Sequence, residues 1–137
     1  MGIIIDTSIL IAVERQKINF NKWEKYDSAY ISSITITELL IGVYRTNDAT
    51  VRVKRSAFVE HIINSISGIE FGAAEARIYA QILDDLYRKG ITLGAHDLII
   101  GATAIARAYP VLTLNVKDFE RIPGLEVLSI ENIEIDK

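Results

Sequence analysis

The 137 residues are enough for one domain with a core, and half of them are hydrophobic, which argues against intrinsic disorder. The chain contains no cysteine, so disulfides and thiolate metal sites are excluded. Its formal net charge of −3 argues against a broadly basic nucleic-acid surface but allows a local site in which metal ions offset carboxylates. No apolar run approaches the ~20 residues that span a bilayer, and the N-terminus lacks a signal-peptide pattern. We therefore expect a cytoplasmic protein without membrane association.

The first segment combines a buried strand with a carboxylate. Three isoleucines at residues 3–5 form a β-branched run, which is typical of a strand buried on both faces of a parallel sheet. Asp6, Thr7 and Ser8 follow, and each is a good N-cap for the apolar helix predicted after them. Asp6 thus stands at the edge where open α/β sheets bind ligands. An N-cap role for Asp6 is the simpler alternative.

The rest of the chain alternates short apolar runs with longer helical patterns, and it contains no internal repeat or linker. The predicted strands after the first are 29–32, 69–71, 111–114 and 125–130. The predicted helices after the first are 35–44, 51–65, 73–89 and 97–108, with one helical turn at 118–121. This alternation predicts a single α/β domain over residues 1–137 with a mostly parallel sheet.

Two more acids lie at or near predicted helix starts. Glu38 follows Thr35 by three residues, which also fits a capping box in which the Glu38 carboxylate bonds back to the Thr35 amide. Asp97 follows His96 and opens an apolar helix, where the helix dipole alone favours an acid. Each acid has a structural explanation when it is taken singly. Those explanations do not account for the setting that the acids share beside apolar core segments.

A fourth polar element follows the predicted strand at 111–114. Asn115 and Asp118 lie just beyond the end of that strand. Asx residues at such places usually form turns. The functional alternative is that these two side chains complete a polar pocket at the same edge of the sheet.

Four motifs occur in order along the chain: IDTSIL at 5–10, SITITELLIG at 33–42, HDLIIGATA at 96–104 and LTLNVKDF at 112–119. In this order, they resemble the motifs of PIN-domain ribonucleases, most closely those of VapC-type toxins from toxin–antitoxin pairs. The resemblance covers nearly the whole chain, from residue 3 to about residue 128. It implies a three-layer α/β/α sandwich around a parallel sheet and a metal-dependent endoribonuclease activity.

The same resemblance implies a set of site residues. Asp6, Glu38 and Asp97 would be catalytic and would hold Mg²⁺ or Mn²⁺. The family often has a further acid at or near the position of Asn115, so Asn115 and Asp118 are the candidates for additional metal ligands. Three hydroxyl side chains match positions that support the acids by hydrogen bonds: Thr7, Ser8 and Thr113.

These residue types suit phosphodiester hydrolysis. Carboxylate oxygens are hard ligands that suit Mg²⁺, and a bound metal lowers the pKa of its water. Three carboxylates in one pocket also repel one another, so without metal at least one should have a raised pKa. Beside such a site we expect His96 to have a structural or supporting role rather than to act as a general base.

Partners follow from the basic residues and from the resemblance. A cluster of basic side chains is usually a solvated face, and contact with RNA phosphates is the functional hypothesis for Arg45, Arg52, Lys54 and Arg55. The resemblance implies an RNA substrate, either tRNA or rRNA. It also implies a homodimer and a cognate antitoxin that holds the toxin inactive.

Other functions fit the sequence less well. A phosphatase with an aspartyl nucleophile would need an acid at position 8, where this chain has Ser8. A phospho-receiver domain would need paired acids near the end of the first strand, and Asp6 has no such neighbour. A non-catalytic PIN-like module that binds RNA or protein is the alternative, suggested by Asn115. The presence of all three acids argues against it.

Overall fold

The computed structural model describes residues 2–19 and 28–131, and within them five strands form one sheet in the order β3-β2-β1-β4-β5. All four strand pairings are parallel, so the carboxyl ends of the strands share one edge. The prediction of a parallel sheet is confirmed. The strands are β1 (Gly2–Ile5), β2 (Ser28–Ser32), β3 (Ser67–Ile69), β4 (Val111–Leu112) and β5 (Val127–Leu128).

Helices connect the strands, and their predicted extents hold to within two residues at each end. They are α1 (Thr7–Glu14), α2 (Ser33–Tyr44), α3 (Ala49–Ser65), α4 (Ala73–Arg88), α5 (Ala95–Arg107) and the short α6 (Val116–Phe119). Among the described residues, no helix has both the length and the apolar character that crossing a membrane requires.

Three strand predictions need correction. β3 ends at Ile69 instead of beginning there, because it is an edge strand that pairs through Ser67 and Gly68, residues without an apolar signal. The strand predicted at 111–114 ends at Leu112, and the Thr113 side chain turns toward Asp6 instead. The strand predicted at 125–130 is likewise reduced to the two residues that pair with β4.

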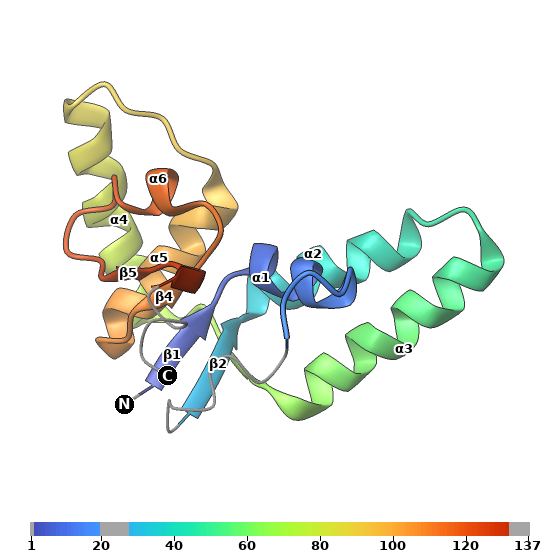
Figure 1. Ribbon diagram of the computed structural model, residues 1–137. Helices are drawn as coiled ribbons and strands as arrows, with labels where there is room; N and C mark the ends of the chain where they lie inside the picture. Colours follow the sequence, from blue (N-terminus) through green and yellow to red (C-terminus); the bar gives the residue numbers. More distant parts are fainter. Residues whose placement is uncertain (1, 20–27, 132–137) are drawn as a thin grey trace.

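β1 lies between two cores. Ile3 and Ile5 pack with side chains of α1, α2 and α3, whereas Ile4 packs with side chains of α4, α5 and α6. All three isoleucines are fully buried, as expected for a central strand covered on both faces. The helices therefore form one layer on each face of the sheet, which confirms the α/β/α sandwich (Figure 1).

Candidate active site

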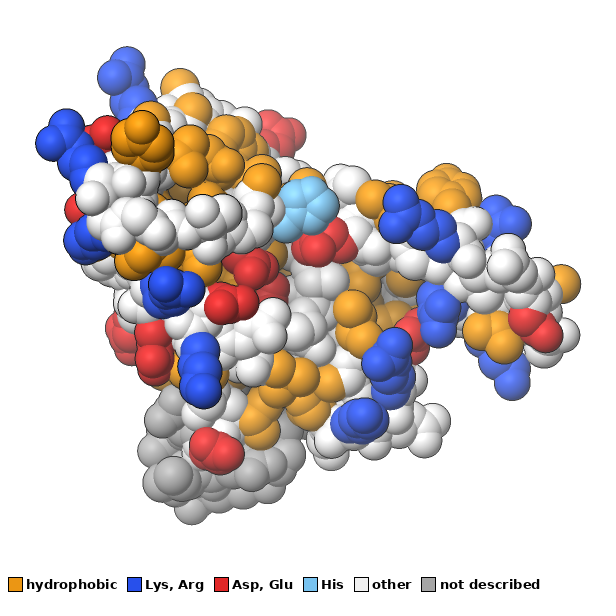
Figure 2. Space-filling view, turned by 90° about the horizontal axis from the view of Figure 1, so that it is seen from above, with side chains coloured by type: hydrophobic (Ala, Val, Ile, Leu, Met, Phe, Trp, Pro, Cys, Tyr) orange, Lys and Arg blue, Asp and Glu red, His pale blue; other side chains and the backbone are white. Residues whose placement is uncertain are grey.

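The predicted site acids come from both helix layers and meet at the carboxyl edge of the sheet. Asp6 follows β1 directly and its backbone N–H donates to the Leu112 carbonyl of β4, 2.9 Å away. Glu38 lies in the middle of α2, on the same layer as α1. Asp97 lies in the first turn of α5, on the opposite layer. Figure 2 shows acidic side chains gathered between the two groups of helices.

Hydroxyl groups hold the buried Asp6 carboxylate. Ser8 Oγ and Thr113 Oγ1 both donate to Asp6 Oδ2, at 2.6 Å and 2.8 Å. Each hydroxyl oxygen accepts a backbone N–H in turn, Ser8 from Leu114 at 3.1 Å and Thr113 from Asn115 at 2.9 Å. Asp6 occupies the N-cap position of α1, but its side chain makes no capping hydrogen bond. Its carboxylate is thus directed into the site.

Burial dominates the electrostatics of Asp6. The side chain is 3 % exposed, and this desolvation raises its pKa above the ordinary value. The hydrogen bonds from Ser8 and Thr113 lower the pKa and only partly offset the burial, while the negative charge of Glu38 raises it further. The fold therefore holds the Asp6 carboxyl group at a buried position where its ionised form is energetically unfavourable.

Glu38 is held by a threonine from another helix. Thr7 Oγ1 of α1 donates to Glu38 Oε1 at 2.7 Å, and the Thr7 hydroxyl also lies 3.0 Å from that of Thr35. The capping-box explanation is wrong, because α2 begins at Ser33 and Ser32 is its N-cap. Glu38 is consequently past the first turn, and its carboxylate faces α1 instead of its own helix start.

Asp97 shows most directly that the acids share one site. Burial raises the pKa of Asp97 to about 6, and the nearby negative charges of Asp6, Asp118 and Glu38 raise it as well. His96 acts in the opposite direction and lowers this pKa. The prediction that one crowded carboxyl group has a raised pKa in the metal-free protein is confirmed.

The cluster lacks a lysine or arginine partner among the described residues. Ion pairs with lysine or arginine form elsewhere in this part of the chain: Arg55–Glu14, Arg88–Asp84 and Lys89–Asp85. The contact that reaches the cluster is from His96 Nδ1 to Glu38 Oε2, at 3.3 Å. The cluster is therefore a concentration of negative charge that hydroxyl groups orient but do not neutralise.

This donor set fits a hard divalent cation. Within residues 2–19 and 28–131, no three His, Asp or Glu side chains lie close enough together to hold an ion as they stand. Mg²⁺ usually keeps several waters and binds proteins through one or two carboxylates, so direct contact with every acid is not required. Uncompensated carboxylates at the edge of a parallel sheet meet this need.

The two candidates after β4 differ in position. Asn115 occupies the N-cap position of α6, makes no side-chain cap, and acts on the site through its backbone N–H to Thr113. Asp118 is exposed on α6, and its charge reaches Asp97. The charge of Asp118 therefore reaches the cluster, and the contact of Asn115 with the site is made through its backbone N–H.

The four basic residues do not share one surface. Arg55 donates to Glu14 Oε2 at 3.1 Å and to Thr46 Oγ1 at 2.8 Å. Arg52 instead lies over the Tyr44 ring, 5.9 Å from its centroid, in a hollow on the other side of the α2–α3 pair. Arg45 and Lys54 are exposed. Lys54 and Arg55 line one hollow together with Arg15, whereas Arg52 lies apart from them, so the four residues are divided between surfaces and their contact with RNA stays a prediction.

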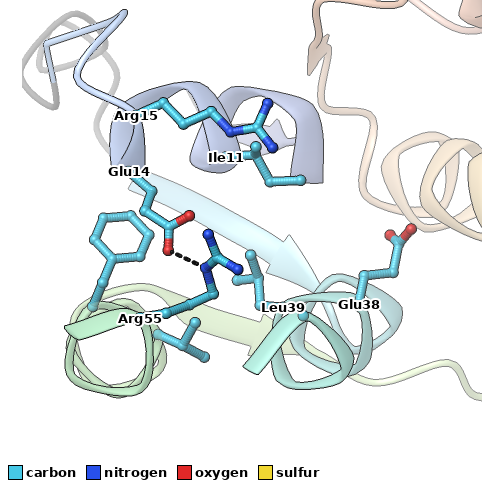
Figure 3. Close-up of a pocket in the computed structure, with 9 residues that line it drawn as sticks. Ile11, Glu14, Arg15, Glu38, Leu39 and Arg55 are labelled. Carbon is cyan, nitrogen blue, oxygen red and sulfur yellow. Dashed lines mark hydrogen bonds and ion pairs between the residues drawn. The ribbon is translucent and has the colours of Figure 1, made fainter. Parts of the chain in front are cut away.

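A groove of about 130 Å³ between α1, α2 and α3 is lined by Arg55 and by one acid of the cluster, Glu38. Its lining includes the apolar side chains of Ile11, Leu39 and Phe58, and Glu38 stands at one end (Figure 3). Arg15 extends over Ile11 along this groove, and sequence reasoning missed it. The available signal was helical spacing, because Arg15 lies four residues after Ile11 and shares its face of the helix.

Comparisons with known proteins agree with this architecture. The PIN domain family model matches residues 3–125. The chain is 52% identical to Ribonuclease VapC1 of Rickettsia felis, over 96% of this chain and 98% of that protein. It is 32% identical to the tRNA(fMet)-specific endonuclease VapC of Salmonella typhimurium, over 82% of this chain and 80% of that protein.

A solved structure shares the fold. It is the crystal structure of VapBC2 from Rickettsia felis bound to a promoter DNA fragment, with a TM-score of 0.85 and 27% identity, covering 94% of this chain and 98% of that chain. The matched residues of the family model include all of the acids described above. The chain belongs to the PIN-domain family, and within it to the VapC ribonucleases.

Proposed function

We propose that this PIN-domain ribonuclease is a divalent-metal-dependent endoribonuclease and the toxin of a toxin–antitoxin pair. One observation carries the proposal: Asp6, Glu38 and Asp97 come from both helix layers to one edge of the sheet and influence one another electrostatically. No lysine or arginine among the described residues pairs with them. An acidic cluster of this kind suits the binding of Mg²⁺ or Mn²⁺.

The metal-binding residues in this proposal are Asp6, Glu38 and Asp97, with Asp118 as an additional acid and Asn115 as a neutral oxygen donor. When bound, a divalent ion offsets charge on the phosphoryl oxygens and lowers the pKa of a coordinated water. The cluster offers two features for this: oxygen ligands only, and negative charge that the described residues leave uncompensated.

The other side chains keep the acids in place. Ser8 and Thr113 orient the Asp6 carboxylate, and Thr7 orients that of Glu38, each by donating a hydrogen bond to a carboxylate oxygen. Such hydrogen bonds favour the charged form without neutralising it. The three hydroxyl groups therefore support the catalytic acids in the ionised state that a cation binds.

We propose structured RNA, tRNA or rRNA, as the substrate. The Salmonella typhimurium relative is named as a tRNA(fMet)-specific endonuclease, which favours tRNA. Arg15 and Arg55 line the groove that ends at Glu38, so they are nearest to where a substrate phosphate chain would pass. Lys54 lines a neighbouring hollow together with Arg15 and Arg55, whereas we assign Arg45 and Arg52 at most a general attraction to RNA.

The chain would act in the cytoplasm as a homodimer.

An antitoxin is the second partner in this proposal. The support is the fold shared with the VapBC2 structure and the apolar groove between α1, α2 and α3. A partner segment in this groove would lie beside Glu38 and would obstruct access to the acids. The Glu14–Arg55 ion pair crosses the same groove and offers polar contacts to such a segment (Figure 3).

Incubation of the purified chain with total RNA tests the activity. With Mn²⁺ or Mg²⁺ we expect new RNA 5′ ends at a small number of positions, and with EDTA none. Asp6→Asn should lower the cleavage rate at least about 100-fold, because even partners of metal ligands typically contribute about 10–100-fold. Asp84→Asn is the matched control, since Asp84 is an exposed acid that pairs with Arg88 on α4.

The same assay separates the enzyme from the non-catalytic alternative. A binding module would leave the RNA intact under every metal condition. Cleavage that persists in EDTA, or that Asp6→Asn leaves unchanged, would overturn the proposed metal site.

A further inference from the structure

The two oxygens of the Glu38 carboxylate face two different helices. Oε1 accepts the hydrogen bond from Thr7 of α1, at 2.7 Å. Oε2 lies 3.3 Å from Nδ1 of His96, in the first turn of α5. The threonine contact stays within one helix layer, whereas the histidine contact crosses from the α1–α3 layer to the α4–α6 layer. His96 therefore connects the two halves of the site.

His96 also adjoins the acid of its own helix. It directly precedes Asp97 in the chain, and both residues lie in the first turn of α5. The first turn of α5 therefore holds both Asp97 and His96, and the His96 ring contacts Glu38 of the opposite layer. Because His96 and Asp97 are adjacent, a shift of the Glu38 carboxylate away from His96 also changes the distance between the carboxylates of Glu38 and Asp97.

Packing does not explain the position of this ring. The His96 side chain is 49% exposed, and it belongs to neither hydrophobic core among the described residues. The Glu38 side chain is 30% exposed, so the contact lies at the accessible rim of the site. A side chain of this kind contributes little to the stability of the fold.

We propose that His96 is a positioning residue that fixes the Glu38 carboxylate relative to Asp97 so that the acids of both layers bind one divalent cation. This inference rests on the proposed metal-dependent function. A neutral imidazole can carry its proton on Nδ1, so the contact requires no positive charge on the ring. The distance from Nδ1 to Oε2 is 3.3 Å, longer than the ~2.9–3.0 Å that is usual for an N–H···O hydrogen bond.

Calorimetric titration with Mn²⁺ alone, at constant pH, tests the role. His96→Ala should weaken Mn²⁺ binding by about 10–100-fold, the usual effect of losing a partner that orients a metal ligand. His96→Asn should bind Mn²⁺ within a few-fold of the wild type, because the Asn amide presents an N–H donor near the position of Nδ1. At saturating Mn²⁺, the KM for RNA should be unchanged in both variants.

A Glu38→Gln background supplies the decisive comparison. If His96 acts through Glu38, adding His96→Ala to Glu38→Gln should weaken Mn²⁺ binding by no more than about twofold. An equal Mn²⁺ affinity of His96→Ala and the wild type would overturn the inference, as would His96→Asn binding as weakly as His96→Ala. A wild-type protein that shows neither Mn²⁺ binding nor metal-dependent cleavage would instead overturn the proposed function itself.

Discussion

At the scale of single residues, the site is built from acids that hydroxyl groups orient. Two hydroxyls converge on one oxygen of Asp6, and one hydroxyl holds one oxygen of Glu38. Asp97 receives no such support in the hydrogen bonds of the described residues, and its pKa is raised to about 6. The folded protein thus maintains a charge arrangement that is unfavourable until a cation arrives.

Asp97→Asn should separate stability from activity. The substitution removes a crowded negative charge while keeping the shape of the side chain, so the metal-free melting temperature at pH 7 should be equal to or higher than that of the wild type. RNA cleavage should fall at least about 100-fold. Thermal unfolding in EDTA, followed by circular dichroism, checks the first part. A large drop in the melting temperature would assign Asp97 a structural role, as a first-turn acid of α5.

At the scale of elements, local sequence signals predict the helices better than the strand ends. Asp48 caps α3 by accepting a hydrogen bond from the Val51 N–H at 2.9 Å, a local interaction of the type that sequence reasoning can find. The end of β4 depends on Thr113 reaching Asp6, across 107 positions of the chain. The sequence carries no local signal for such a contact.

The same distinction explains what could be predicted about the site. The meeting of Asp6, Glu38 and Asp97 at one edge of the sheet was predictable, because each belongs to a motif beside an apolar segment, and their catalytic role stays a prediction. The resemblance also implied that Thr7 supports the acids, and the structure confirms this with its hydrogen bond to Glu38, whereas the local capping pattern had offered Thr35. Arg15 was missed because its relevance appears only when α1 packs beside α2 and α3. The features of the site that the sequence did not predict thus depend on contacts between different helices and strands.

Asp48→Ala tests the cap at the start of α3. Loss of the hydrogen bond to Val51 should lower the free energy of unfolding by about 0.5–2 kcal/mol. Asp48→Asn should retain most of the stability, because asparagine is an equally good N-cap. Urea denaturation measures both. Cleavage per folded molecule should be unchanged in either variant, and a loss of activity at full stability would place this helix start in the substrate-binding surface.

At the scale of the whole molecule, the acids lie where two separately packed halves meet. One core joins β1 to α1, α2 and α3, and the other joins it to α4, α5 and α6. Asp6 and Glu38 lie in or beside helices of the first half, and Asp97 lies in a helix of the second. Repulsion among these acids therefore acts between the two halves, and it should lower the free energy of unfolding of the whole domain.

The stability of the metal-free protein should consequently depend on pH. The pKa of Asp97 is about 6 when folded, against 3.8 as the reference value, so the folded state binds the proton more tightly than the unfolded chain. Protonation of Asp97 thus favours folding. The free-energy cost of keeping the ionised Asp97 carboxylate in the folded protein is fully present above about pH 6 and disappears toward pH 4. Relative to Asp97→Asn, the wild type should gain stability as the pH falls from 7 to 4.

Urea denaturation of both proteins in EDTA, at several pH values, measures this difference. The raised pKa of Asp6 has the same sign, and its largest cause, burial, is common to both proteins. A stability difference that does not change with pH would show that Asp97 titrates as an ordinary exposed acid.

The three isoleucines of β1 have one more consequence. Because residues 3–5 are identical, sliding the strand by one position would still present isoleucine to both cores, so hydrophobicity alone cannot set its alignment with β2 and β4. The flanking residues do: a Cβ on Gly2 would come within 2.6 Å of the Tyr109 ring, and Asp6 must reach Ser8 and Thr113. Asp6, which we propose as a metal-binding acid, thus also fixes the alignment of β1 with its neighbouring strands.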